Sequence, residues 1–276
     1  MGLKVNTNLE AIDVHNNLVN TNSKVAASLQ RLSSGLRINS AKDDASGFAI
    51  ANSFAAKISA MRVASQNASE AQSMLQTADG AYTKINDILV RMKSLATQAA
   101  SGQTESLSTM NNEFKALQDE IDRIAGSTKY GSTVLVDGTS SAATGITFQV
   151  GATNATSDQI TVKFDSATAT ALGVSSTIGI NGLASAQAAM SAIDTALTSI
   201  NSFMGSVGAY QNRLQYTIDN LATSIENYSS SESTIRDVDM ASEISDFTKN
   251  QILQQAGMAM LAQANSGPQQ ILTLLR

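Results

Sequence analysis

A chain of 276 residues with 42% hydrophobic but only 4% aromatic residues can hold one or two domains, and its supply of large core side chains is small. The net charge of −5 argues against nucleic-acid binding, which needs a clustered basic surface, and the absence of cysteine excludes disulfides and thiolate metal sites. The single proline permits long helices.

The N-terminus, MGLKVNTNLEAIDVHNNLVN, does not read as a cleaved secretory signal, because it lacks a continuous apolar run of about 7–15 residues. No segment approaches the roughly 18 apolar residues of a membrane-spanning helix, so we expect no membrane span and no membrane partner. If the protein leaves the cell, we expect a route without a cleaved signal peptide.

Helical periodicity dominates the first half of the chain. Apolar residues keep heptad steps within residues 5–12 and again within residues 25–36, with four asparagines between the halves. From Phe54 to Ala96 they recur at alternating steps of four and three, which predicts one long helix with a coiled-coil seam. A shorter stripe from Leu107 to Ile124 predicts a second helix.

The period then changes from 3.5 to 2. The segments ITFQV (146–150) and ITVKF (160–164) alternate apolar and polar residues, and the turn-like GATNATSDQ lies between them. This pattern predicts a β-hairpin as the only plausible β region. The Gly, Ser, Thr and Ala residues around it are typical of loops.

The longest stripe follows, from Met190 to Tyr228, and predicts a helix on the order of 60 Å long at 1.5 Å per residue. Together the stripes predict a mainly α fold, a rod of long, coiled-coil-like helices with a small β-hairpin region.

The C-terminal segment is apolar on several sides. Residues 238–264 share no narrow stripe, and a helix that is apolar all round is buried all round. The tail SGPQQILTLLR (266–276) adds Ile271, Leu272, Leu274 and Leu275, which also need cover, and Pro268 is expected to interrupt the helix or mark a bend. With so little aromatic bulk in the chain, we expect another copy of the chain to provide the cover.

Two segments at opposite ends of the chain resemble one protein family. LQRLSSGLRINSAKDDASGFAIA (29–51) closely resembles the N-terminal signature of bacterial flagellins. ESTIRDVDMASEISDFTKNQILQQAGMAMLAQANSGPQQILTLLR (232–276) resembles their C-terminal signature. The resemblance covers residues 1–137 and 185–276 and leaves the stretch 140–184 in the part that flagellins vary freely.

The resemblance implies a subunit of the bacterial flagellar filament, which serves swimming motility. Such a subunit is exported unfolded by the flagellar type III apparatus and polymerises outside the cell, at the distal tip under a cap. The implied partners are other copies of the chain, an export chaperone, the filament cap and hook-associated proteins. The terminal helices are implied to pair as a coiled coil around the filament channel, with the rod outside them.

Three regions follow from the resemblance and the periodicity together. Residues 1–42 and 238–276 form an inner core, 43–139 and 184–237 form the helical rod, and 140–183 form a short variable hairpin and loop region. That region is shorter than a separate outer domain of at least about 50 residues, so we expect a thin, smooth filament.

Assembly contacts are implied near the end of the first region and in the C-terminal tail. The candidates are Arg31, Leu32, Leu36, Arg37, Lys42, Asp43, Ile271, Leu272, Leu274 and Leu275. The three basic residues are candidate partners for acids of another subunit. Asp43 and Asp44 could suggest a metal site, but the pattern Ser40-x-x-Asp43 before an apolar run favours a helix-capping box.

A second implied surface concerns the innate immune system of a host. Flagellins contain an arginine and a leucine in a segment of the type LQRVREL that Toll-like receptor 5 recognises, together with a glutamate on the next helix. Here LVRMKSL keeps Arg91 and Leu95, and NNEFKALQDEIDR places Glu113 at the glutamate position. Arg91 and Leu95 are four residues apart and share a helix face, which also suits lateral packing between rods.

The remaining candidates favour structural interpretations. His15 is the only histidine and has no nucleophile motif beside it, so we interpret it as a solvated or interface residue. Met258 and Met260 suit helix packing better than a soft-metal site. Exposed Ser and Thr residues within 139–182 resemble the sites at which some flagellins carry O-linked sugars. We expect no catalytic residue, metal or cofactor.

Three alternatives to a filament subunit can be weighed. A hook–filament junction protein shares the plan of terminal helices, but the match at both ends favours flagellin. A signalling coiled coil such as a chemoreceptor rod needs a membrane span. An enzyme needs a motif such as H-E-x-x-H, G-x-S-x-G or a phosphate-binding loop, and the sequence contains none of them.

Overall fold

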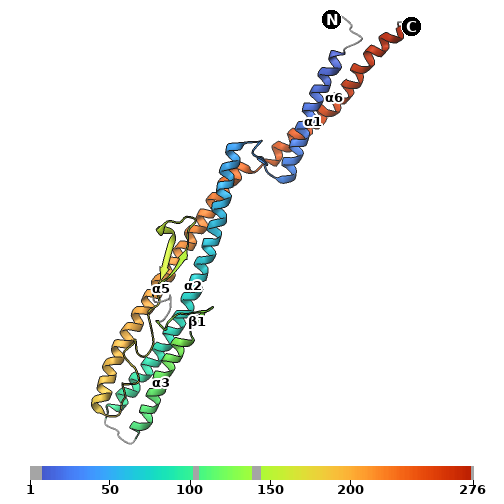
Figure 1. The fold of residues 1–276 in the computed structure, drawn as a ribbon. Coiled ribbons are helices and arrows are strands. Elements are labelled where there is room, and N and C mark those ends of the chain that lie inside the picture. Colours follow the sequence, from blue (N-terminus) through green and yellow to red (C-terminus); the bar gives the residue numbers. More distant parts are fainter. Residues whose placement is uncertain (1–7, 102–105, 139–143, 275–276) are drawn as a thin grey trace. The chain divides into compact units, whose positions relative to one another are not determined.

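The computed structural model describes residues 8–101, 106–138 and 144–274, with side chains described as far as residue 266 (Figure 1). The helices are α1 (Leu9–Ser34), α2 (Ala45–Ala99), α3 (Leu107–Ser127), α5 (Leu183–Arg236) and α6 (Met240–Leu274), with a short 3-10 helix at Thr156–Asp158. The strands are β1 (Lys129–Tyr130), β2 (Thr133–Val134), β3 (Ile146–Gln149) and β4 (Gln159–Val162). The expected mainly α fold with a small antiparallel sheet is confirmed.

The chain divides into two compact units. Lys57–Glu226 form one, here called the central unit, and the segments before and after it form the other, the terminal unit. The long helices α2 and α5 each contribute residues to both units.

In the terminal unit, α1 and α6 run antiparallel and pack side by side (Figure 1). Asn8 caps α1 by accepting a hydrogen bond from the N–H of Ala11 at 3.1 Å, and its amide also donates to the carbonyl of Ala264 at 2.8 Å. Farther along the pair, Gln254 donates to the side chain of Asn22 at 2.6 Å. The asparagines of α1 therefore leave the helix unbroken, and one of them joins it to α6.

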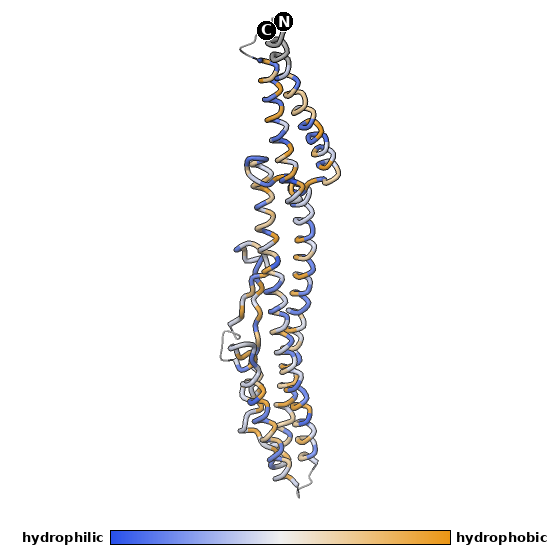
Figure 2. Tube along the Cα trace, turned by 90° about the vertical axis from the view of Figure 1, so that its right-hand side faces the viewer, coloured by the Kyte–Doolittle hydropathy of each residue, from blue (hydrophilic) through white to orange (hydrophobic). Residues whose placement is uncertain are grey.

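The terminal unit has almost no core of its own. Within α1, all of which is described, only Ser28 is buried. Figure 2 shows hydrophobic residues recurring along the terminal helices, and many of them are exposed. The exposed ones on α1 and on the described part of α6 are Leu9, Ile12, Val19, Leu29, Met240, Ile244, Ile252, Leu253, Met258 and Met260. Within one chain, α6 is therefore not buried all round, although its composition is that of a buried helix.

The core lies in the central unit, where α2 and α5 run antiparallel. Lys93 of α2 contacts Asp194 at the start of α5, and the ring of Tyr82 lies 5.8 Å from that of Phe203 farther along. The predicted seam of α2 is buried from Ile58 to Ala96, apart from half-buried polar positions. The helix α3 adds Phe114, which is fully buried. The three heptad stripes thus meet in one apolar core.

The predicted hairpin is confirmed. Strands β3 and β4 pair antiparallel, with Ile146 opposite Val162 and Gln149 opposite Gln159. The expectation of a single β region is wrong, because β1 and β2 form a second antiparallel pair around Gly131, whose φ is 59°. Strands of two residues are too short to show an alternating pattern, so periodicity could not reveal them.

Polar side chains of α3 hold the irregular segment that follows β4. The buried amide of Gln118 donates to the carbonyls of Ser175 and Ile178 at 2.8 and 3.0 Å. Asn111 accepts a hydrogen bond from the N–H of Ile180 at 3.0 Å, and Asp122 accepts one from Ala169 at 2.8 Å. This segment is irregular, as its loop composition predicts, but it packs on the core because its backbone groups find partners on α3.

The expectation that Pro268 interrupts the C-terminal helix is wrong, because α6 passes through this residue. A proline lacks the N–H group for one helical hydrogen bond, while the bonds on either side can persist. A bend at this position stays a prediction.

Candidate functional site

The assembly candidates between residues 31 and 43 lie at and beside the place where the segment after α1 pairs with the connection between α5 and α6. Gly35 ends α1 in the left-handed conformation at φ 72° and donates to the carbonyl of Arg31 at 2.8 Å. The next residues then pair with the connection between α5 and α6. Arg37 donates to the carbonyl of Arg236 at 2.7 Å, and Val238 donates to that of Gly35 at 3.0 Å. These two backbone bonds flank a β-bridge between Leu36 and Asp237.

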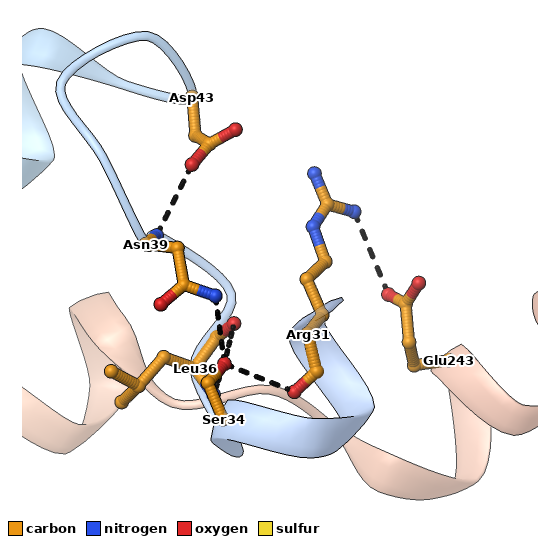
Figure 3. Close-up of polar contacts among 6 residues, drawn as sticks. All are labelled: Arg31, Ser34, Leu36, Asn39, Asp43 and Glu243. Atoms are coloured by element: carbon orange, nitrogen blue, oxygen red, sulfur yellow. Dashed lines mark hydrogen bonds and ion pairs between the residues drawn. The ribbon is translucent and has the colours of Figure 1, made fainter. Parts of the chain in front are cut away.

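Arg31 and Arg37 are engaged within their own chain. The guanidinium of Arg31 lies 3.6 Å from the carboxylate of Glu243 on α6 (Figure 3). Arg37 donates through its side chain to the carbonyl of Ile235 at 2.7 Å. The structure therefore gives each arginine a partner in the same chain, and N–H groups of each guanidinium remain for an acceptor on another subunit.

Ser34 organises the turn after α1. Its hydroxyl accepts hydrogen bonds from the amide of Asn39 at 2.7 Å and from the N–H of Leu36 at 3.2 Å (Figure 3). The hydroxyl also lies 3.3 Å from the carbonyl of Arg31, to which it donates. Because a single hydroxyl joins three parts of the turn, the position of Leu36 is well defined.

The capping box predicted at Ser40 and Asp43 is wrong, because it makes Ser40 the N-cap, whereas α2 begins at Ala45 and is capped by Asp44. The carboxylate that accepts from the first N–H groups of α2 belongs to Asp44, which bonds Ser46 and Gly47 at 3.0 Å each. Asp43 precedes the helix start by two residues, so its carboxylate turns back to the N–H and hydroxyl of Ser40 at 2.9 and 3.0 Å. These hydrogen bonds from Ser40 lower the pKa of Asp43.

A side chain at Gly47 would displace the groups that form this corner. A Cβ atom at this position would lie 2.4 Å from a carboxylate oxygen of Asp44 and 2.7 Å from the side chain of Ile38. The segment AKDDASGF thus combines a cap with a close approach of two chain segments.

The other assembly candidates divide into two groups. Leu32 and Leu36 are half-buried, and Lys42 is exposed. The side chains of Ile271, Leu272 and Leu274 lie outside the described part of the structure, as does the whole of Leu275.

The receptor candidates Arg91 and Glu113 lie together on neighbouring helices. Two nitrogens of the Arg91 guanidinium donate to one carboxylate oxygen of Glu113, at 2.9 and 2.7 Å, and both side chains are exposed. Leu95 does not join them on the surface, because it is only 3% exposed and belongs to the core. The surface that the structure offers at this site is therefore a paired arginine and glutamate.

Several residues that stabilise the fold were not singled out by the sequence analysis. Arg236 lies over the ring of Phe48 at 6.0 Å; both residues lie in the two signature segments, but no local spacing shows that they meet. The polar residues Asn111, Gln118 and Asp122 of α3 are spaced by seven and four, so helical periodicity places them on one face. That spacing was available in the sequence as a signal.

The described residues hold no group of three or more His, Cys, Asp or Glu side chains placed to bind a metal ion. His15, Met258 and Met260 are exposed on the terminal helices. Across the described ranges, no helix has the length and hydropathy needed to cross a membrane.

Family models match both ends of the chain. The N-terminal helical region of bacterial flagellin matches residues 5–141, and the C-terminal helical region matches residues 190–275. The chain belongs to the bacterial flagellin family. Flagellins are structural proteins that form the flagellar filament, and the flagellin resemblance of the two terminal signatures is thereby confirmed.

Two related proteins of the flagellar filament align over nearly the whole length, and one solved flagellin structure aligns over about half of it. A flagellin of Bacillus subtilis (strain 168) is 40% identical, with 99% of this chain and 100% of that one covered. A flagellar filament 33 kDa core protein of Treponema phagedenis is 39% identical, with 99% of each chain covered. The crystal structure of Bacillus cereus flagellin is 31% identical and covers 56% of this chain and 88% of that one, with a TM-score of 0.49.

Proposed function

We propose that this chain is the structural subunit of a bacterial flagellar filament that drives swimming. The uncovered apolar surface of α1 and α6 is the observation that carries the proposal. Full burial of a large apolar side chain contributes about 1.5–3 kcal/mol, so a polymer that covers several of them per subunit gains a large free energy. The full-length similarity to a filament core protein favours the filament over the hook–filament junction.

The terminal segments 1–42 and 238–276 form the inner layer of this filament. The antiparallel pairing of α1 with α6 supports this assignment, because it leaves large apolar side chains exposed on two neighbouring helices. Residues 43–139 and 184–237 form the helical rod outside that layer. Residues 140–183 form its variable region, and the contacts of α3 with the segment after β4 keep that region close to the helices.

The chain reaches its place of assembly unfolded, through the flagellar type III apparatus. An export chaperone covers the apolar terminal helices before export, and the filament cap and hook-associated proteins receive the chain outside the cell. The scarcity of buried residues in the terminal unit supports this route, because segments with little core of their own lose little stability when kept unfolded.

Dissociation of the purified polymer in mild acid and return to neutral pH tests the proposed function. We expect monomers at low pH and tubular filaments, visible by electron microscopy, after neutralisation. A chain that stays monomeric with folded terminal helices would overturn the proposal.

In a host, the monomer is recognised by Toll-like receptor 5 through Arg91 and Glu113. Both side chains are exposed, and their pairing presents a donor and an acceptor side by side on α2 and α3. Leu95 supports this surface from below, as part of the core beneath Arg91.

The substitution Arg91→Ala is expected to weaken receptor activation about tenfold, because it removes a charge-assisted contact and leaves Glu113 without its partner. A reporter assay with purified monomer measures the effect. Lys84→Ala is the matched control, since Lys84 is an exposed cation on the same helix that pairs only locally with Asp87. Equal activation by Arg91→Ala and the parent chain would refute the assignment.

A further inference from the structure

A groove in the central unit lies between α2 and the turn that joins the hairpin strands. Its volume is about 420 Å³, within the range of small binding pockets. Ala60, Val63 and Ala64 of α2 line one side, and Gln149 and residues 151–154 line the other. Val63 is 56% exposed, so the apolar side of the groove is open to an incoming side chain.

Hydrogen bonds hold the polar side of this groove in place. The amide of Asn67 on α2 donates to the carbonyl of Gln149 at 3.0 Å. The amide of Gln149 donates in turn to the carbonyls of Gly151 and Thr153, at 3.0 and 2.6 Å. The carboxylate of Asp158 accepts from the hydroxyl of Thr153 and from its N–H, the latter at 2.9 Å, and these hydrogen bonds lower the pKa of Asp158. The groove is therefore built by the fold before any partner arrives.

The most exposed large hydrophobic side chain described in the structure is Tyr216 of α5, at 75%. Its neighbours one turn away are Arg213 and Asp219, both exposed. An aromatic ring with a hydroxyl at its tip suits a groove that has an apolar side and an amide-lined side. An exposed tyrosine at the centre of such a patch is typical of an interface anchor.

The charges on α2 beside the groove and on α5 beside Tyr216 are complementary only if the two helices run antiparallel. On α2, two exposed charged residues lie on either side of the groove residues Val63 and Asn67 in the sequence. Arg62 comes before them, and Glu70 comes after them. Subunits of a helical polymer related by one screw operation point the same way, so α5 of one copy meets α2 of a neighbour antiparallel, as these helices run within a copy. In that direction Arg213 lies toward Glu70, and Asp219 lies toward Arg62.

We infer that Tyr216 of one copy inserts into the groove at Val63 and Asn67 of a neighbouring copy. A projecting side chain and a groove at different places on one chain form a heterologous contact, which generates an open helical polymer. The inference rests on the proposed filament function and adds a lateral contact between central units to the cover of the terminal helices.

Cross-linking in mixed filaments tests this contact, because the chain contains no cysteine of its own. Chains with Tyr216→Cys are polymerised together with chains carrying Val63→Cys. The filaments are treated with a thiol-specific linker of about 8–10 Å, the distance between axes of packed helices. We expect a covalent dimer in the mixture and none in filaments of either variant alone.

The control mixture replaces Val63→Cys with Val90→Cys, which places the thiol on the same helix at an equally exposed valine, roughly 40 Å away along the helix. Filaments that give no more dimer with Val63→Cys than with Val90→Cys would overturn the contact and leave the filament function standing. Failure of the parent chain to polymerise would instead count against the filament function.

If a cysteine variant does not polymerise, reversing the charges of Arg213 and Glu70 tests the same contact. Arg213→Glu is expected to raise the critical concentration for polymerisation about fivefold, and the added change Glu70→Arg is expected to restore it. Equal critical concentrations for the single and double variants would contradict the pairing of Arg213 with Glu70.

Discussion

A chain that lacks residues 267–276 is expected to fold its central unit normally and to form no filaments. The deletion removes Ile271, Leu272, Leu274 and Leu275, whose burial against other subunits would contribute roughly 1.5–3 kcal/mol each. Since about 1.4 kcal/mol changes an association constant tenfold, the critical concentration for polymerisation should rise at least about a thousandfold. Sedimentation after neutral reassembly measures the loss.

The full-length control for this deletion replaces the same four residues with glutamine, which keeps the chain length and a good helix former at each position. It should fail to polymerise as the shortened chain does, because the apolar contacts and not the length are responsible. Normal filaments from either variant would show that the tail is not covered by other copies.

The second large effect is expected from Phe114→Ala, which should destabilise the monomer by about 3–5 kcal/mol. Phe114 is fully buried on α3, so its removal leaves a cavity at the meeting point of the three helical stripes. For a unit of this size, the melting temperature should fall by roughly 6–20 °C. Thermal unfolding followed by circular dichroism on dilute monomer measures the change.

The matched variant is Ile252→Ala on α6, where the side chain is 60% exposed in the single chain. It should change monomer stability by less than about 0.5 kcal/mol, because it leaves no cavity in the monomer. It should nevertheless impair polymerisation, whereas Phe114→Ala acts on monomer stability. An equal loss of monomer stability in both variants would contradict the division between a packed central unit and an uncovered terminal unit.

Periodicity alone was enough to predict the long helices and the hairpin. The seam of α2 and the inner face of α5 are continuous over many turns, and each turn repeats the same requirement for burial. The strands β1 and β2 were not predicted, because a strand of two residues is too short to show a period. The N-cap of α2 was predicted at Ser40 and not at Asp44, because Ser40 and Asp43 match the spacing of a capping box and local spacing does not reveal the turn at residues 41–43.

The candidate site residues could be predicted mainly from the resemblance to flagellins. Sequence spacing places Arg91 and Leu95 on one helix face, but it does not say which of them faces the core. The structure buries Leu95, which follows Met92 of the seam by three residues and thus continues its spacing. Glu243, the partner of Arg31, is more than 200 residues away in the sequence, so no local pattern could identify it.

The division of the chain into two units gives a physical reason for its low aromatic content. Large buried side chains such as Tyr82, Phe114 and Phe164 are all in the central unit. The aromatic residues of the terminal unit, Phe48, Phe54, Tyr228 and Phe247, are only half-buried, and many of its aliphatic and methionine side chains stay exposed until a neighbour covers them. A chain that completes its core by polymerising needs fewer large residues of its own.

Electron cryo-microscopy of filaments reassembled from the purified chain tests the central claim most directly. The claim is that identical copies cover the apolar surface of α1 and α6. The reconstruction should show these helices paired in the innermost layer around the channel, and no separate domain outside the helical rod. A reconstruction with α1 and α6 facing solvent on the outer surface would contradict the claim.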